Sequence, residues 1–151
     1  MGTDYPRIAV SSIVRRQDRY LLVLRGAGRN QGDYAFPGGK VEAGEELAEA
    51  ALRELQEETG IVGHSARFFR LYDLITRSDQ GPVESHYVLA VHLVEAEESQ
   101  DAVAADDAAE AGWYTAAEIK ALQTPPSVLE CIDHIEANWL HAGMTVPAME
   151  S

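Results

Sequence analysis

The sequence predicts an α/β fold, and the distribution of apolar residues along the chain is the reason. Segments rich in β-branched, aliphatic and aromatic residues, typical of strands, occur at 7–14, 19–25, 66–76 and 83–94. Between the second and third of these, apolar residues recur at helical spacing from residue 45 or 46 to Glu58, and Gly60 is placed to end that helix. Two capping patterns near the C-terminus predict further helices, so strands and helices are mixed along the chain.

The first two strand segments are predicted to pair as a hairpin through a tight turn at Arg16-Gln17-Asp18. The Gly-rich segment 26–33 is predicted to be a loop. Residues 66–76 form a mostly continuous apolar run, which is typical of a buried strand. A turn at 78–82 then leads into 83–94, giving a second hairpin.

The last third of the chain is predicted to hold a long loop and two helices. Residues 95–110 are acidic and rich in alanine without clean periodicity, which indicates a loop. Thr115 and Ser127 are each followed three residues later by glutamate, so each is predicted to begin a helix. The second helix has one apolar stripe, formed by Val128, Ile132, Ile135 and Trp139. Cys131 is expected to be a small buried hydrophobic residue in this helix, and the tail from 145 is expected to be loose.

Length and composition limit the classes of function. With 151 residues and 46% hydrophobic content, residues 1–151 are predicted to form a single domain. The excess of 25 acidic over 12 basic residues argues against a protein that grips a nucleic-acid backbone. The single cysteine fits a reducing compartment, and we find neither a signal peptide nor an apolar run of membrane-spanning length. We therefore expect a cytoplasmic protein with a small diffusible partner, no nucleic acid and no membrane.

The stretch from Gly39 to Ile61 concentrates glutamate in a short loop and the helix that follows. Glu54, Glu57 and Glu58 stand at i, i+3 and i+4, so their like charges share one helix surface and repel each other. Mg²⁺ or Mn²⁺ would relieve this repulsion, because both prefer oxygen ligands. A Glu-rich helix is more often a solvated face. The spacing over the whole stretch is what favours the metal site here.

That spacing resembles, without a departure, the signature of the Nudix hydrolases. The matching positions are Gly39, five residues, Glu45, seven residues, Arg53-Glu54-Leu55, one residue, Glu57-Glu58, one residue, and Gly60-Ile61. The resemblance implies a Nudix-type α/β/α sandwich with a mixed β-sheet. It also implies hydrolysis of a nucleoside diphosphate linked to another group, in which water and Mg²⁺ or Mn²⁺ cleave a P–O–P bond.

Residue by residue, the resemblance assigns Glu54, Glu57 and Glu58 to metal binding, with the backbone carbonyl of Gly38 as a further ligand. In some family members the position of Glu54 is the general base instead. Glu45 and Arg53 match a pair in which the guanidinium orients the catalytic carboxylates.

Further site residues are expected outside this stretch. Arg25, Arg29 and Lys40 are the cations expected nearest the substrate phosphates, although lone cations are usually only solvated. Asp107 precedes Trp113-Tyr114 and is the candidate to bind a metal or deprotonate water. Nearby acidic residues compete for this role, namely Glu97, Glu98, Asp106 and Glu110.

The substrate is less well specified than the reaction. The chain looks most like small bacterial ADP-ribose or nucleotide-sugar pyrophosphatases, and nucleoside-triphosphate-sanitising members are the alternative. A non-catalytic nucleotide-sensing module is a reading of another class, which the intact signature disfavours. The sequence leaves open the exact substrate, the general base, the number of metals and the phosphorus attacked. It also leaves open the oligomeric state, although dimers are frequent in the family.

Overall fold

The computed structural model describes the chain except residues 1–4, 27–31, 80, 98–100, 106–107 and 140–151. Along the described residues the elements are β1 (Arg7–Ile13), β2 (Arg15–Arg16), β3 (Arg19–Arg25), β4 (Tyr34–Ala35), β5 (Gly38–Lys40), α1 (Leu47–Thr59), β6 (Gly63–Arg77), β7 (Val83–Ala96), β8 (Ala108–Thr115), α2 (Ala116–Lys120) and α3 (Pro126–Trp139). The first sheet has the order β5-β1-β7-β6, and a second joins β2, β3 and β4, with β8 also paired to β3. In the first sheet β1 and β7 are parallel and the other pairs are antiparallel, so this sheet is mixed as predicted.

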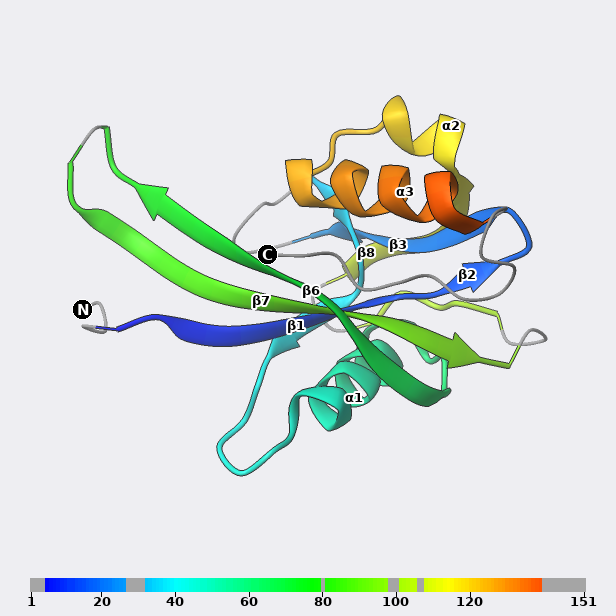
Figure 1. The fold of residues 1–151 in the computed structure, drawn as a ribbon, viewed down its shortest axis with the longest axis horizontal. Coiled ribbons are helices and arrows are strands. Elements are labelled where there is room, and N and C mark those ends of the chain that lie inside the picture. The colour runs from blue at the N-terminus through cyan, green and yellow to red at the C-terminus, as the bar shows by residue number, and fades with distance from the viewer. Residues whose placement is uncertain (1–4, 27–31, 80, 98–100, 106–107, 140–151) are drawn as a thin grey trace.

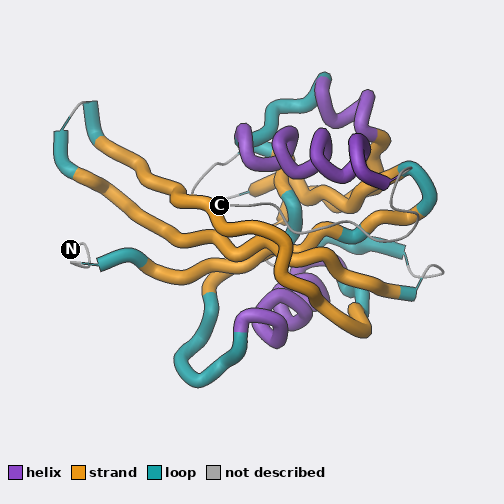
Figure 2. The backbone as a smooth tube through the Cα atoms, in the orientation of Figure 1, coloured by secondary structure: helices purple, strands orange, loops and turns teal. Residues whose placement is uncertain are grey.

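Helices cover both sides of the strands. Helix α1 lies on one side, and α2 and α3 lie together on the other (Figures 1 and 2). The two faces of β1 show the same division, because Val10 packs with Ala51 of α1 while Ile13 joins the core cluster that contains Ile132 of α3. The predicted α/β/α sandwich is therefore confirmed, with a second sheet added to the mixed one.

Helix α1 begins and ends almost where its residue pattern predicts. Its first residue is Leu47, and Glu49 accepts a hydrogen bond from the backbone N–H of Glu46 at 2.9 Å. Gly60 ends the helix with φ of 77°, a left-handed conformation that glycine adopts without strain. The helical spacing of Leu47, Ala48, Ala51, Leu52 and Leu55 predicts one apolar stripe facing the core. Leu55 is fully buried, whereas Leu47 is 38% exposed.

The predicted hairpin between residues 7–14 and 19–25 is wrong. Strand β1 pairs with β5 and β7 and not with β3. Before the turn, only the two residues of β2 pair with β3. The turn between β2 and β3 is made by Gln17, whose φ is 57°. Since the chain passes from the first sheet to the second just after β1, two strands that are neighbours in sequence belong to different sheets.

The expectation that residues 66–76 form a buried strand is also wrong. They lie in β6, which is the edge strand of the first sheet. Phe69 is fully buried, but Leu71 and Ile75 are 39% and 46% exposed. The β6–β7 hairpin is confirmed, and Figure 1 shows it extending beyond the helices. Apolar content alone does not distinguish an edge strand from a central one.

The C-terminal third differs from the prediction at its boundaries. Strand β7 runs to Ala96 and β8 starts at Ala108, so the expected loop of residues 95–110 is shorter at both ends. Thr115 caps α2 as predicted, by accepting the Glu118 N–H at 3.2 Å. Ser127 does not begin α3, because the helix already starts at Pro126, and proline is well suited to a first helical position.

Helix α3 packs its apolar stripe on the core. Val128, Ile132 and Ile135 are buried, and Cys131 is fully buried as predicted. The side chain of Trp139 and the tail from 145 lie outside the described residues. Of the helices that the structure describes, none is long and apolar enough to cross a membrane.

The edge position of β6 predicts unequal effects of two substitutions in that strand. Phe69→Ala should lower the free energy of unfolding by about 3–5 kcal/mol, because it empties a buried site. Leu71→Ala should lower it by less than about 1 kcal/mol, because that side chain is partly in water. Chemical denaturation of both variants measures the difference, and similar losses would contradict the assignment of β6 as a half-exposed edge.

Candidate functional site

Gly38 and Gly39 of β5 lie against two of the predicted catalytic glutamates, Glu58 and Glu54. One carboxylate oxygen of Glu58 accepts the backbone N–H of Gly38 at 2.7 Å, and Glu58 is only 4% exposed. A Cβ at Gly39 would overlap the carboxylate of Glu54. Glu54 therefore reaches β5 only because position 39 has no side chain, whereas at Gly38 a Cβ would meet the backbone of β1 instead.

Arg25 gives the buried carboxylate its charged neighbour. Its Nη1 lies 3.8 Å from the second oxygen of Glu58. Glutamate is rarely buried without a partner, and here an N–H on one side and a guanidinium on the other offset the loss of water. Arg25 belongs to β3 and Glu58 to α1, so the pair also connects the second sheet to the helix.

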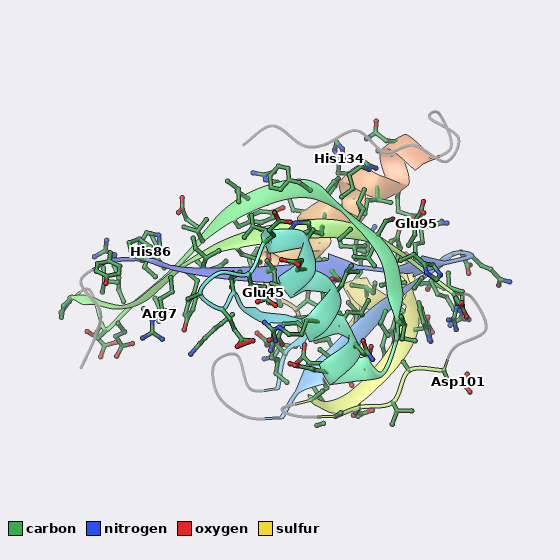
Figure 3. The ribbon with its side chains drawn as sticks, turned by 90° about the horizontal axis from the view of Figure 1, so that it is seen from below. Arg7, Glu45, His86, Glu95, Asp101 and His134 are labelled. Carbon is green, nitrogen blue, oxygen red and sulfur yellow. The ribbon has the colours of Figure 1, made fainter. Side chains whose placement is uncertain are left out.

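Arg53 holds the remaining acidic side chains together. It makes two hydrogen bonds to the carboxylate of Glu45, at 2.6 and 2.9 Å. Its Nη1 donates to Glu54 at 2.9 Å and to Glu57 at 3.0 Å. Its Nη2 also reaches the carbonyl of Lys40 at 3.1 Å. Figure 3 views the molecule from the side of α1, with Glu45 labelled beside the start of the helix. One rigid guanidinium thus fixes three carboxylates relative to β5.

The pKa of Glu45 shows the strength of this arrangement. Hydrogen bonds from Arg53, and then one from the backbone N–H of Glu42, lower the pKa from 4.5 to about 2. Glu45 is therefore ionised at any ordinary pH. It remains the partner that positions Arg53 beside Glu54 and Glu57.

The segment that follows β7 closes on the end of α1 beside the buried glutamate. The backbone N–H of Ala105 donates to the carbonyl of Glu58 at 2.9 Å, and that of Val103 donates to the carbonyl of Thr59 at 2.8 Å. Two helix-end carbonyls thus find partners outside the helix. Asp107, the predicted acid near this position, lies outside the described residues, and so does Arg29.

A cleft of about 590 Å³ lies between the first sheet and the start of α3. Arg25, Gly39 and Lys40 line it, so two of the predicted phosphate contacts stand where the cleft meets the glutamates. Small-molecule sites typically have volumes of roughly 300–1,000 Å³, so a nucleotide-sized ligand fits. The other lining residues come from several strands and α3, and include Ala9, Ser11, Phe36, Leu89, Val128 and Cys131.

The structure places the three predicted metal-binding glutamates against two different arginines. Glu54 and Glu57 meet at Arg53, and Glu58 meets Gly38 and Arg25. Within the described part of the chain, no three His, Cys, Asp or Glu side chains are gathered in positions to hold a metal ion. The sequence did not indicate Ser11 or the other cleft residues of the strands, because they form no local pattern and meet only through sheet pairing.

Comparison with known proteins places these observations in a family. A family model described as NUDIX domain matches residues 5–134. The chain is 34% identical over 110 residues to a protein of Methanocaldococcus jannaschii named ADP-ribose pyrophosphatase, covering 73% of this chain and 62% of that protein. The chain thus spans less than two thirds of this relative's length.

Two solved structures resemble the fold. A MutT NUDIX hydrolase from Burkholderia pseudomallei has a TM-score of 0.76 and 24% identity, with 86% of this chain and 98% of that chain covered. A bifunctional NMN adenylyltransferase/ADP ribose pyrophosphatase from Francisella tularensis, solved with AMP and a Mn ion, has a TM-score of 0.70 and 25% identity. The comparison covers 91% of this chain and 43% of the Francisella chain.

The lowered pKa of Glu45 predicts a specific pH dependence of stability. At neutral pH, Glu45→Gln should melt at a lower temperature than the wild type, because its amide bonds Arg53 without charge. A lowered pKa contributes stability above pH 4.5 that is lost as the pH falls towards 2, so the two melting temperatures should converge over that range. Thermal melts of both proteins between pH 2 and 7 measure this.

The control is Glu84→Gln, which changes an exposed carboxylate in β7. It should melt close to the wild type at every pH. A difference between wild type and Glu45→Gln that persists unchanged to pH 2 would contradict the ion pair as its cause.

Proposed function

Because the chain belongs to the NUDIX family, we propose that it is a hydrolase that cleaves the P–O–P bond of a nucleoside diphosphate linked to another group. The observation that carries the proposal is the position of Glu58, buried between Gly38 and Arg25 where the glutamate cluster meets the cleft. A buried carboxylate beside a nucleotide-sized cleft is suited to chemistry on a polyphosphate. The name of the Methanocaldococcus relative favours ADP-ribose as the substrate. A nucleotide sugar is the alternative within the same class, because it too joins a nucleoside to a sugar through a diphosphate.

We propose that Glu54, Glu57, Glu58 and the carbonyl of Gly38 hold Mg²⁺ or Mn²⁺. Their donor atoms are oxygens, which suit both cations, and Gly39 leaves the carboxylate of Glu54 room against β5. When bound, the cation neutralises charge on the diphosphate and acidifies a water. The Mn ion in the Francisella structure supports this choice of cation.

The other charged residues of the site position these groups and the substrate. Arg53, itself anchored by Glu45, keeps Glu54 and Glu57 from turning away from β5. Arg25 and Lys40 line the cleft and supply positive charge for the phosphates. Arg29 as a further phosphate contact and Asp107 as a metal ligand or base are proposals from the sequence alone.

The substrate is tested by measuring hydrolysis in Mg²⁺ of ADP-ribose, nucleotide sugars, dinucleoside polyphosphates, and ordinary and oxidised deoxynucleoside triphosphates. We expect kcat/KM for ADP-ribose or one nucleotide sugar to exceed that for the triphosphates at least about tenfold, a difference of roughly 1.4 kcal/mol in transition-state binding. The highest value for a triphosphate would favour the sanitising alternative. Saturable binding without hydrolysis of any substrate would favour a sensing module.

Glu58→Gln tests the proposed metal site with two measurements. We expect kcat to fall by about 100-fold or more, which is typical when a preorganised charged group is removed from a catalytic site. We also expect Mg²⁺ to raise the Tm of the wild type but not of the variant, because a ligand that binds only the folded state stabilises it. Steady-state kinetics and thermal melts across a Mg²⁺ titration provide both results.

The matched control is Glu49→Gln in the same helix, where an amide can still accept the hydrogen bond from the N–H of Glu46. It should keep the kcat and the Mg²⁺ response of the wild type. A Tm that does not respond to Mg²⁺ in the wild type, or equal losses of kcat in both variants, would contradict the proposed role of Glu58.

A further inference from the structure

Two adjacent serines in β1 face opposite sides of the sheet, and their hydroxyls differ in bonding. The Ser12 Oγ donates to the carbonyl of Ala51 at 3.1 Å, which ties β1 to α1. Ser11 is only 5% exposed, yet its Oγ has no hydrogen-bond partner among the residues that the structure describes. Buried polar groups are almost always hydrogen-bonded, so the Ser11 hydroxyl calls for an explanation.

The position of Ser11 points to a ligand as the partner. Ser11 lines the cleft and is paired across the sheet with Gly38 of β5 and Val91 of β7. A Cβ built on Gly38 would lie 3.0 Å from the Ser11 Cβ, so the serine stands directly beside the residue whose N–H holds Glu58. Ser11 is therefore located where the cleft approaches the backbone that holds Glu58.

The residues around Ser11 indicate which part of a ligand its hydroxyl contacts. On the same face of the sheet its neighbours Ala9 and Val91 are apolar, whereas positive charge in the cleft comes from Arg25 and Lys40. Phosphate oxygens are matched best by such cations. A serine hydroxyl is uncharged and both donates and accepts hydrogen bonds. It therefore suits a neutral ligand group that also does both, such as another hydroxyl.

We propose that the Ser11 hydroxyl binds a ribose hydroxyl of the nucleoside diphosphate, and that the site thereby favours ribose-bearing over deoxyribose-bearing ligands. This inference rests on the proposed function, and it selects among its substrates. A site that hydrogen-bonds a ligand hydroxyl rejects the analogue without it, because the protein's own buried group is then left unpaired.

The test is calorimetric titration, in Mg²⁺, of ADP and of 2′,3′-dideoxy-ADP, which lacks both ring hydroxyls. The wild type should bind ADP about five- to tenfold more tightly, the ratio expected for one net hydrogen bond. Ser11→Ala should bind the two ligands equally. The inference is overturned if Ser11→Ala keeps the preference, if it loses affinity for both ligands to the same extent, or if the wild type binds neither.

Stability measurements separate a ligand contact from a structural role. The Tm of Ser11→Ala should equal or exceed that of the wild type, because the variant removes an unpaired buried hydroxyl. Ser12→Ala should melt at a lower temperature, because it loses the bond to Ala51, and should keep the preference for ADP. A Tm of Ser11→Ala lowered as far as that of Ser12→Ala would show a structural hydroxyl and would also overturn the inference.

The two proposals fail in different ways. If the wild type hydrolyses a nucleoside diphosphate derivative but Ser11→Ala leaves the ratio of the two affinities unchanged, only the role of Ser11 is wrong. If the wild type neither hydrolyses any member of the substrate panel nor binds ADP, the proposed function and the role of Ser11 are both wrong.

Discussion

The hydrogen bond from the backbone of Gly38 to the buried carboxylate of Glu58 is the contact on which the site depends. It joins α1 to β5, so it sets how closely the helix approaches the first sheet. It also requires glycine at 38, because a Cβ there would strike the backbone of β1 at Val10. With Glu58 held in this position, Arg25 of the second sheet lies beside its carboxylate and Ala105 bonds its main-chain carbonyl. Through its carboxylate and its main-chain carbonyl, Glu58 thus contacts both sheets and a connecting segment.

The charges around this contact are balanced within the protein. The spacing of Glu54, Glu57 and Glu58 implies repulsion along one helix surface. In the folded chain Arg53 forms ion pairs with Glu54 and Glu57, and Arg25 forms one with Glu58, so each carboxylate has a cation near it. A divalent ion bound to the same three carboxylates, as proposed, would therefore compete with Arg53 and Arg25 for their oxygens.

The parts of the fold that follow from local pattern were predictable from the sequence. Helical spacing located α1, and Gly60 located its end, because both depend on residues within a few positions of each other. The pairing of β1 was not predictable in this way. Its partners are β5 and β7, and a strand carries no local signal that chooses between a near and a distant neighbour. The exposure of β6 was missed for a related reason, because an edge position is a property of the whole sheet.

Local pattern likewise predicts the chemistry proposed for the site, whereas its substrate specificity depends on residues that are distant in sequence. The proposed metal ligands and the arginine that positions them lie in a short stretch around one helix, so a motif contains them. The cleft takes residues from β1, β3, β4, β5, β6, β7 and α3. Apart from Arg25, Gly39 and Lys40, these residues look ordinary in their own segments. Ser11 and Ser12 illustrate the consequence, because as adjacent residues of the same type they are indistinguishable in sequence. Only the alternation of the strand, which turns one towards α1 and the other into the cleft, gives them different partners. A reaction class can therefore be inferred from one motif, whereas the preferred substrate depends on side chains that only the folded sheet brings together.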